Sequence, residues 1–159
     1  MRRGPPVRIT RDILIDRPPA EVWPVVVDLE SHPSWRPALK ELRQVSEGPL
    51  RVGSRVREVL AWRGREIVLA DEVSAFELER RLGIRGGWRA ATFALDILLE
   101  PRGQATGVTF DWTLQPKSLL MRLAAPFLRG TFERSTEEEL EGLKRYVEAP
   151  TGVRGEPQA

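Results

Sequence analysis

The pattern of hydrophobic and polar residues predicts a strand near the start of the chain and an abrupt change to helix after it. Residues 7–16, VRITRDILID, alternate between polar and apolar positions, which is typical of a strand with one buried face. Pro18 and Pro19 end this strand. A short helix is expected over 21–28, because proline is accepted in the first turn of a helix. A second short helical turn is expected over 29–35.

The middle of the chain predicts six further strands. They are expected at 40–46, 54–62, 65–74, 79–86, 90–100 and 106–114. Arg63 and Gly64 suit a two-residue hairpin turn. With that turn, the apolar face of the hairpin carries Val56, Leu60, Trp62, Ile67, Leu69 and Val73. The same register places two carboxylates, Glu58 and Asp71, on this apolar face, and alternation in the first strand places Arg11 on the matching face.

A helical period begins at residue 117 and continues to about residue 149. Pro126 lies inside this run and is expected to kink the helix, because it removes one backbone hydrogen bond. The middle of the helix is poor in large apolar residues, with Gly130, Thr131 and Ser135 in place of them. Small residues there would leave a void opposite a curved sheet. The acidic run 137–139 is expected to face solvent.

Composition and charge narrow the class of protein. The chain has 159 residues, 41% of them hydrophobic, and no cysteine. We expect one domain over 7–149, a disordered lead-in over 1–6 and a flexible tail over 150–159. The segment MRRGPP has no apolar stretch behind it, and no apolar run reaches the ~20 residues that span a bilayer. A cytoplasmic location is therefore expected.

The basic and acidic residues nearly balance, with a net charge of +2. Arginine supplies most of the basic residues, but acidic residues are interspersed and no stripe of one sign forms, so no nucleic-acid partner is expected. No nucleotide-binding, zinc-protease or hydrolase motif is present. His32 is the only histidine and cannot build a metal site alone. We expect neither metal nor cofactor, and place His32 at the surface or at a cavity mouth.

One segment carries a family resemblance. The residues that match are Ile15, Pro18, Pro19, Glu21, Val22, Trp23, Val27, Asp28, Leu29, Pro33, Trp35 and Pro37. With the order strand, two short helices, six strands and long helix, this segment resembles the START-like, Bet v 1-like superfamily, in its bacterial polyketide cyclase/dehydrase branch. The sequence departs from that pattern at His32, where an aromatic Tyr or Phe is usual.

The resemblance implies an α+β helix-grip fold, in which a seven-stranded antiparallel sheet curves around the C-terminal helix and leaves an apolar cavity. The residues expected to line that cavity are Arg11, Trp35, Leu60, Trp62, Leu69, Phe93, Leu95, Phe110, Trp112, Leu123, Phe127 and Thr131. We expect Trp23 to pack inward and Trp35 to lie near the entrance. The Gly86-Gly87-Trp88 turn is a candidate lid.

Three functions remain open from the sequence. The first is binding, and possible transport, of a hydrophobic or aromatic small molecule such as a lipid or polyketide-like compound. The second is a cyclase, aromatase or dehydratase in which Glu58 and Asp71 move protons, although either carboxylate could simply pair with Arg11 or Arg80. The third is a protein-interaction module with a filled cavity. The chain is expected to be a monomer or a homodimer.

Overall fold

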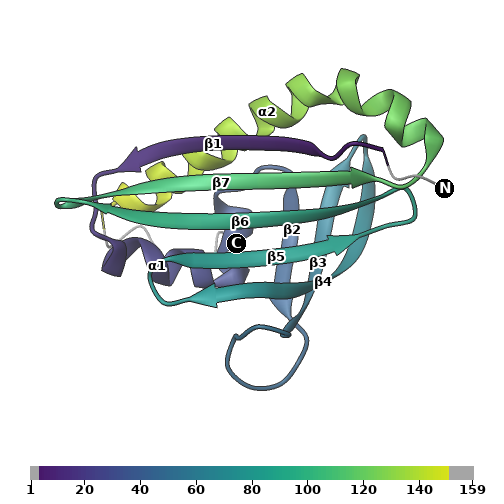
Figure 1. The fold of residues 1–159 in the computed structure, drawn as a ribbon. Coiled ribbons are helices and arrows are strands. Elements are labelled where there is room, and N and C mark those ends of the chain that lie inside the picture. Colours follow the sequence, from purple (N-terminus) through teal and green to yellow (C-terminus); the bar gives the residue numbers. More distant parts are fainter. Residues whose placement is uncertain (1–3, 151–159) are drawn as a thin grey trace.

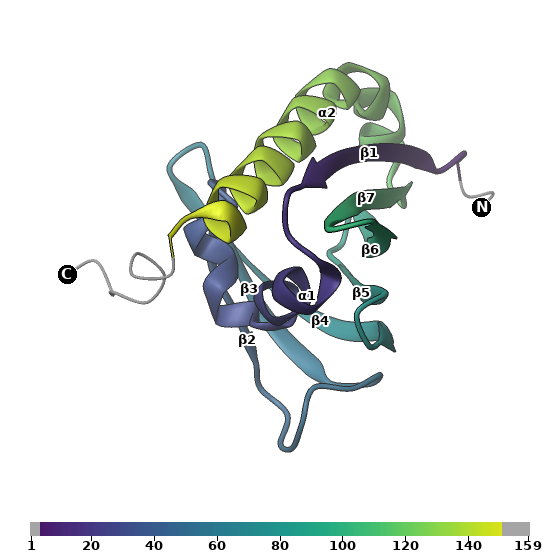
Figure 2. The same cartoon turned by 90° about the vertical axis from the view of Figure 1, so that its left-hand side faces the viewer.

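A computed structural model describes residues 4–150 and shows a curved antiparallel sheet wrapped around one side of a long helix (Figures 1 and 2). The elements are β1 Val7–Ile15, α1 Pro19–Val27, a 3-10 helix η1 Leu29–Ser34, β2 Leu39–Gln44, β3 Arg55–Trp62, β4 Arg65–Glu77, β5 Arg81–Gly87, β6 Ala91–Arg102, β7 Ala105–Pro116 and α2 Leu119–Glu148. The seven strands lie in the order β1-β7-β6-β5-β4-β3-β2. The predicted element order and helix-grip architecture are confirmed.

The β3–β4 hairpin has the register that its turn predicts. Trp62 faces Arg65 and Val56 faces Asp71. Arg63 and Gly64 have φ angles of 48° and 74°, the left-handed values that a two-residue type I′ turn requires. Alternation from this fixed point carries Glu58 and Asp71 to the concave side of the sheet, where both are 4% exposed.

Strand β4 extends three residues beyond its predicted end and is irregular. Its pairing with β5 shifts register between Val73 and Ala75. An extra residue in one strand changes which side chains face inward beyond it. Phe76 therefore packs edge-on against Trp23 of α1, with ring centroids 5.5 Å apart. The prediction that Trp23 packs inward is confirmed, since Trp23 is 5% exposed.

Helix α2 begins after an N-cap residue, Ser118, and packs against the sheet mainly with its second half. The Ser118 side chain accepts a hydrogen bond from the Met121 backbone N–H at 3.1 Å. The helix is continuous through Pro126, and its axis bends in the first half (Figure 1). Leu140, Leu143 and Val147 are buried against the core.

The ends of the chain differ partly from expectation. Residues 1–3 of the predicted lead-in and 151–159 of the predicted tail lie outside the described residues. Gly4 is buried, and Gln115 donates a side-chain hydrogen bond to its carbonyl oxygen at 2.6 Å. Gly4 is therefore in contact with β7 before β1 begins.

Candidate functional site

Two carboxyl groups share the concave face of the sheet. Glu58 lies on β3 and Asp71 lies diagonally across from it on β4, and we call these two residues the acid pair. Burial raises the pKa of Asp71 to about 9; the neighbouring Glu58 carboxyl group acts in the same direction, while the charge of Arg36 opposes it. Within residues 4–150, no N–H or hydroxyl group donates to either Asp71 carboxyl oxygen. With its pKa raised to about 9, Asp71 keeps its proton at neutral pH.

Strand β5 leaves room for this carboxyl group. Gly86 follows Arg85, which pairs with Glu72, so Gly86 lies beside Asp71 in the sheet. A Cβ atom at Gly86 would overlap Asp71 Oδ1. The glycine is therefore required by close approach of a side chain, not by backbone conformation.

A buried ion pair lies next to the acid pair. Arg36 follows η1, and its Nε lies 3.4 Å from Oε2 of Glu139 on α2, with the two side chains 4% and 10% exposed. These two atoms are within ion-pair range but are not aligned for a hydrogen bond. Burial raises the pKa of Glu139, and Arg36 opposes the shift. The Arg36 guanidinium also lies 5.9 Å from the ring centroid of Trp112.

Arg36 was not predicted as a site residue, and the predicted exposure of Glu139 is wrong. Glu139 was expected to face solvent with the rest of the acidic run, but it is 7% exposed. Its position three residues after buried Thr136 and four before buried Leu143 was the available signal, because that spacing is one helix face. The burial of Arg36 could not be predicted in this way, because the Trp-Arg-Pro segment has no helical or strand periodicity.

The prediction that His32 lies at the surface is wrong. Its side chain is fully buried, and its Nε2 donates to the Val26 carbonyl oxygen at 2.8 Å. Burial, helped by the charge of Arg36, lowers the pKa of His32 to about 3, so the ring is neutral. Trp35 stacks on it at 4.5 Å between centroids and is 3% exposed. Trp35 is thus a core residue and does not lie near an entrance.

The predicted cavity residues divide into three groups. Leu69, Leu95 and Phe110 are buried in the core. Leu60, Phe93 and Trp112 are half-buried. Trp62, Leu123, Phe127 and Thr131 are exposed. For the three helix residues the expectation of an inward position is wrong, because they lie on the face of α2 opposite the buried one.

The outer part of the expected cavity is closed by packing. Trp112 contacts Phe93 and Phe132, with centroids 5.9 Å and 6.3 Å apart. The void between these rings and α2 has a volume of about 10 Å³, the room of a single water. Arg11 lies at the sheet edge and pairs with Glu133 and Glu137 at 3.2 Å and 3.1 Å, so it does not reach the acid pair.

An open groove of about 890 Å³ includes Asp71 among its lining residues. Val56, Asp71 and Gly86 line it from the concave side. Trp88 from the β5–β6 turn and Lys117, just before α2, also line it. Residues of the convex side, among them Arg55 and Arg85, complete its wall. The Gly86-Gly87-Trp88 segment thus borders an opening, and its role as a lid stays a prediction.

The described part of the chain contains neither a metal-binding cluster nor a membrane-spanning helix. Residues 4–150 contain no group of three or more His, Asp or Glu side chains placed to hold a metal ion. In the same range, no helix has the length and apolar character needed to cross a membrane.

Known proteins share this architecture. The ZhuI aromatase/cyclase from Streptomyces sp. R1128 superposes with a TM-score of 0.76 at 14% identity, covering 93% of this chain and 99% of that one. TTHA0849 from Thermus thermophilus gives 0.72 at 21% identity, covering 90% and 97%. Ara h 8.0201 gives 0.70 at 14% identity, covering 90% and 98%. At these identities the likeness shows the fold alone. No protein with a curated description matches the sequence.

The family is identified by the sequence itself. Residues 6–148 match the sequence profile of the family described as polyketide cyclase / dehydrase and lipid transport. That span runs from just before β1 to the end of α2, and so includes every strand and the acid pair. The chain therefore belongs to the polyketide cyclase/dehydrase and lipid transport family.

Proposed function

We propose that the protein binds a hydrophobic or aromatic small molecule, such as a lipid or polyketide-like compound, on the concave face of the sheet, reached through the groove that Asp71 lines. The observation that carries this proposal is an open groove lined by a buried carboxyl group, Asp71, whose pKa is raised to about 9. Family membership supports it. A few fixed polar groups in mostly apolar surroundings are the usual composition of a small-molecule site.

The apolar surface and the polar groups of the site would contribute differently to ligand binding. Burial of apolar ligand surface supplies about 25 cal/mol per Å² and sets affinity. Asp71 sets orientation, because its O–H donates to a carbonyl or hydroxyl oxygen of the ligand. The neighbouring Glu58 favours the protonated form of Asp71.

The test is binding of a panel of lipids and aromatic polycycles, measured by thermal shift and by the change in tryptophan fluorescence. Asp71→Ala removes the donor without adding bulk, so we expect about tenfold weaker binding of the best ligand. Asp71→Asn keeps a donor and should stay within a few-fold of wild type. Asp12→Asn, an exposed carboxylate on β1, is the matched control. The proposal fails if no compound of the panel shifts the wild-type protein.

A second candidate is a dehydratase- or cyclase-type enzyme, favoured by the two neighbouring buried carboxyl groups of Glu58 and Asp71. In a dehydration, the Glu58 carboxylate would take a proton from the carbon next to a carbonyl group. Asp71 would give its proton to the departing hydroxyl, so that a C=C bond forms and water leaves. Return of the proton from Glu58 to Asp71 restores the pair.

The Asp71→Asn variant separates the two candidates. Asparagine can donate a hydrogen bond but cannot transfer a proton to a leaving hydroxyl. Loss of turnover with binding retained would favour the enzyme. Binding without turnover in the wild-type protein, over the same panel, would favour the carrier.

A further inference from the structure

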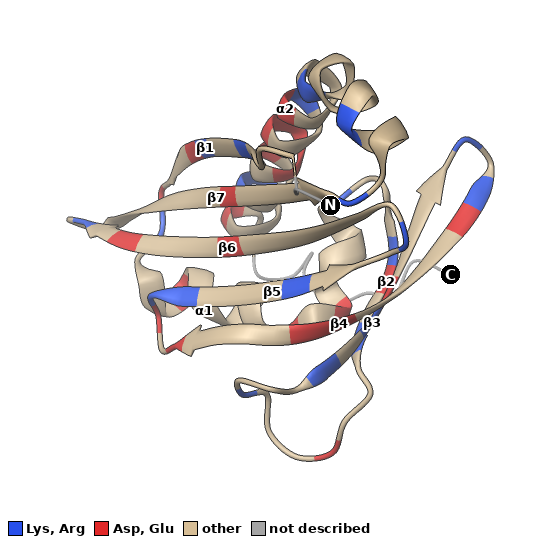
Figure 3. Cartoon of the chain, turned by 45° about the vertical axis from the view of Figure 1, so that its right-hand side comes forward, with Lys and Arg blue, Asp and Glu red and all other residues tan. Residues whose placement is uncertain are grey.

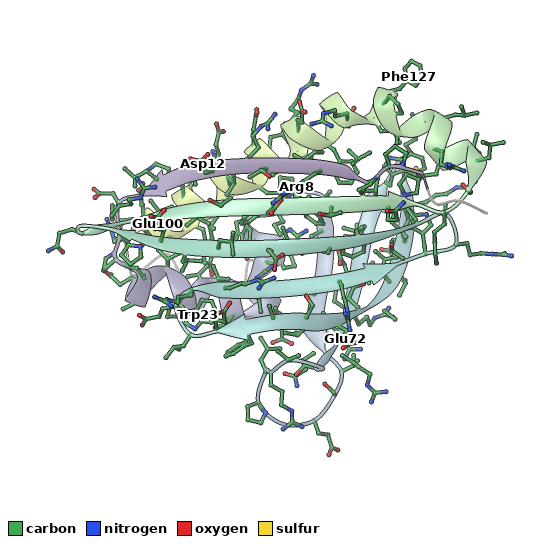
Figure 4. All side chains as sticks on the ribbon, in the orientation of Figure 1. Arg8, Asp12, Trp23, Glu72, Glu100 and Phe127 are labelled. Carbon is green, nitrogen blue, oxygen red and sulfur yellow. The ribbon has the colours of Figure 1, made fainter. Side chains whose placement is uncertain are left out.

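The first half of α2 presents an apolar stripe to solvent. Leu119, Leu120, Leu123 and Phe127 are 68%, 79%, 63% and 87% exposed. Their spacing places them on one side of the helix, opposite the buried side that contains Ala125. Figure 4 shows Phe127 pointing away from the sheet. We call these four residues the α2 stripe. Exposed apolar residues gathered in this way mark an interaction surface.

Most charges near the α2 stripe are positive, and Glu133, which follows this stretch, pairs with Arg129 at 2.9 Å. From Trp112 to Phe132 the sequence contains no Asp or Glu, but it contains Lys117, Arg122 and Arg129. The remainder of α2 is rich in Glu, and Figure 3 shows this division along the helix. An amphipathic helix with large apolar side chains and cations only is the pattern of a segment that lies in the interface of an anionic membrane.

The position of the stripe also suits a membrane surface. The chain enters α2 beside the β5–β6 turn, where the backbone N–H groups of Lys117 and Ser118 both donate to the Ala90 carbonyl oxygen. That turn carries Trp88, which is 38% exposed, and Arg89. Tryptophan and arginine are residues that favour the headgroup region. The α2 stripe and this turn therefore form one apolar and basic end of the molecule.

A second copy of the chain fits the same surface less well. A two-fold interface is self-complementary, so each patch meets its own copy. Lys117 and Arg122 would then face the same cations, because Glu133, the first acidic residue of α2, is already paired with Arg129 and Arg11. An anionic lipid surface has no such conflict.

We propose that the α2 stripe, with Lys117, Arg122 and the β5–β6 turn, docks the protein onto anionic lipid membranes. This inference does not depend on the proposed ligand site. It also places the mouth of the groove, which Trp88 and Lys117 line, next to the bilayer.

The test is co-sedimentation of the full chain with vesicles of phosphatidylcholine mixed with phosphatidylglycerol, and with vesicles of phosphatidylcholine alone. We expect binding to the anionic vesicles that weakens as salt is added. The double variant Leu123→Glu/Phe127→Glu should lose at least tenfold in partitioning. Leu78→Glu, equally exposed at 72% in the β4–β5 turn, is the matched control and should bind as wild type does. Lys117→Gln/Arg122→Gln should weaken binding, while Arg145→Gln on the second half of α2 should not.

Three results would overturn the proposal. The wild-type protein could fail to sediment with anionic vesicles. Leu78→Glu could lose as much binding as the stripe variant. Analytical ultracentrifugation could show a dimer that the stripe variant dissociates while lipid binding stays unchanged, which would assign the stripe to a second copy. Because the substituted side chains are exposed, apart from the half-buried Arg122, circular dichroism should show every variant folded.

Discussion

The proton on Asp71 makes the stability of this protein depend on pH in a predictable direction. The pKa of Asp71 is raised from 3.8 to about 9 in the folded state, chiefly by burial. Above about pH 4 the unfolded chain has released this proton while the folded chain keeps it, so the folded state binds more protons and loses stability as pH rises. This contribution is fully present below the unfolded pKa and is lost as pH rises through the folded pKa.

The perturbation that isolates this effect is Asp71→Asn, which is nearly the same size and does not titrate. Each pH unit between the two pKa values changes the free energy of unfolding by at most about 1.4 kcal/mol. Asp71 stays protonated in the folded chain until the pH approaches 9, so between about pH 6 and pH 8 we expect about 1.0–1.4 kcal/mol per unit. Between about pH 6 and pH 8 the wild type should therefore lose about 2 kcal/mol relative to the variant.

The assay is urea unfolding of both proteins at several pH values, with the difference in the free energy of unfolding plotted against pH. Other titrating groups cancel in this difference because both proteins contain them. Asp12→Asn serves as the control for removing a carboxyl group from the surface. If the wild-type and Asp71→Asn stabilities run parallel from about pH 6 to pH 8, Asp71 is ionised in the folded state and the reasoning on the acid pair is wrong.

Three further predictions concern the same interior. Arg36→Met should cost about 3–5 kcal/mol in urea unfolding, because it leaves Glu139 buried without its cation, and adding Glu139→Leu should restore most of that loss. His32 has a pKa lowered to about 3, so its neutral form stabilises the fold above about pH 6.5 and this is lost as pH falls; His32→Phe should flatten the decline in melting temperature between about pH 6 and pH 4. Gly86→Ala should cost about 1–3 kcal/mol and weaken ligand binding in a thermal-shift assay, because the added methyl overlaps the Asp71 carboxyl group.

Much of the fold could be predicted because strands and helices have local periods. The two-residue turn at Arg63 and Gly64 set the β3–β4 register, and a period of two carried it to Glu58 and Asp71. The bulge near Val73 could not be predicted, since nothing in the alternation marks the extra residue. The helix residues Leu123 and Phe127 were misplaced because spacing identifies a face but not what covers it.

The sequence alone determined the order of elements, the hairpin register and the presence of two carboxylates on the concave face. Tertiary structure decided what those carboxylates meet. Arg36 and Glu139 are far apart in the chain, and only the packing of α2 against the concave side of the sheet brings them within 3.4 Å. Local periods fix which way a side chain points, whereas burial and pKa depend on groups that arrive from distant segments. The buried proton of Asp71 is therefore a property of the folded molecule.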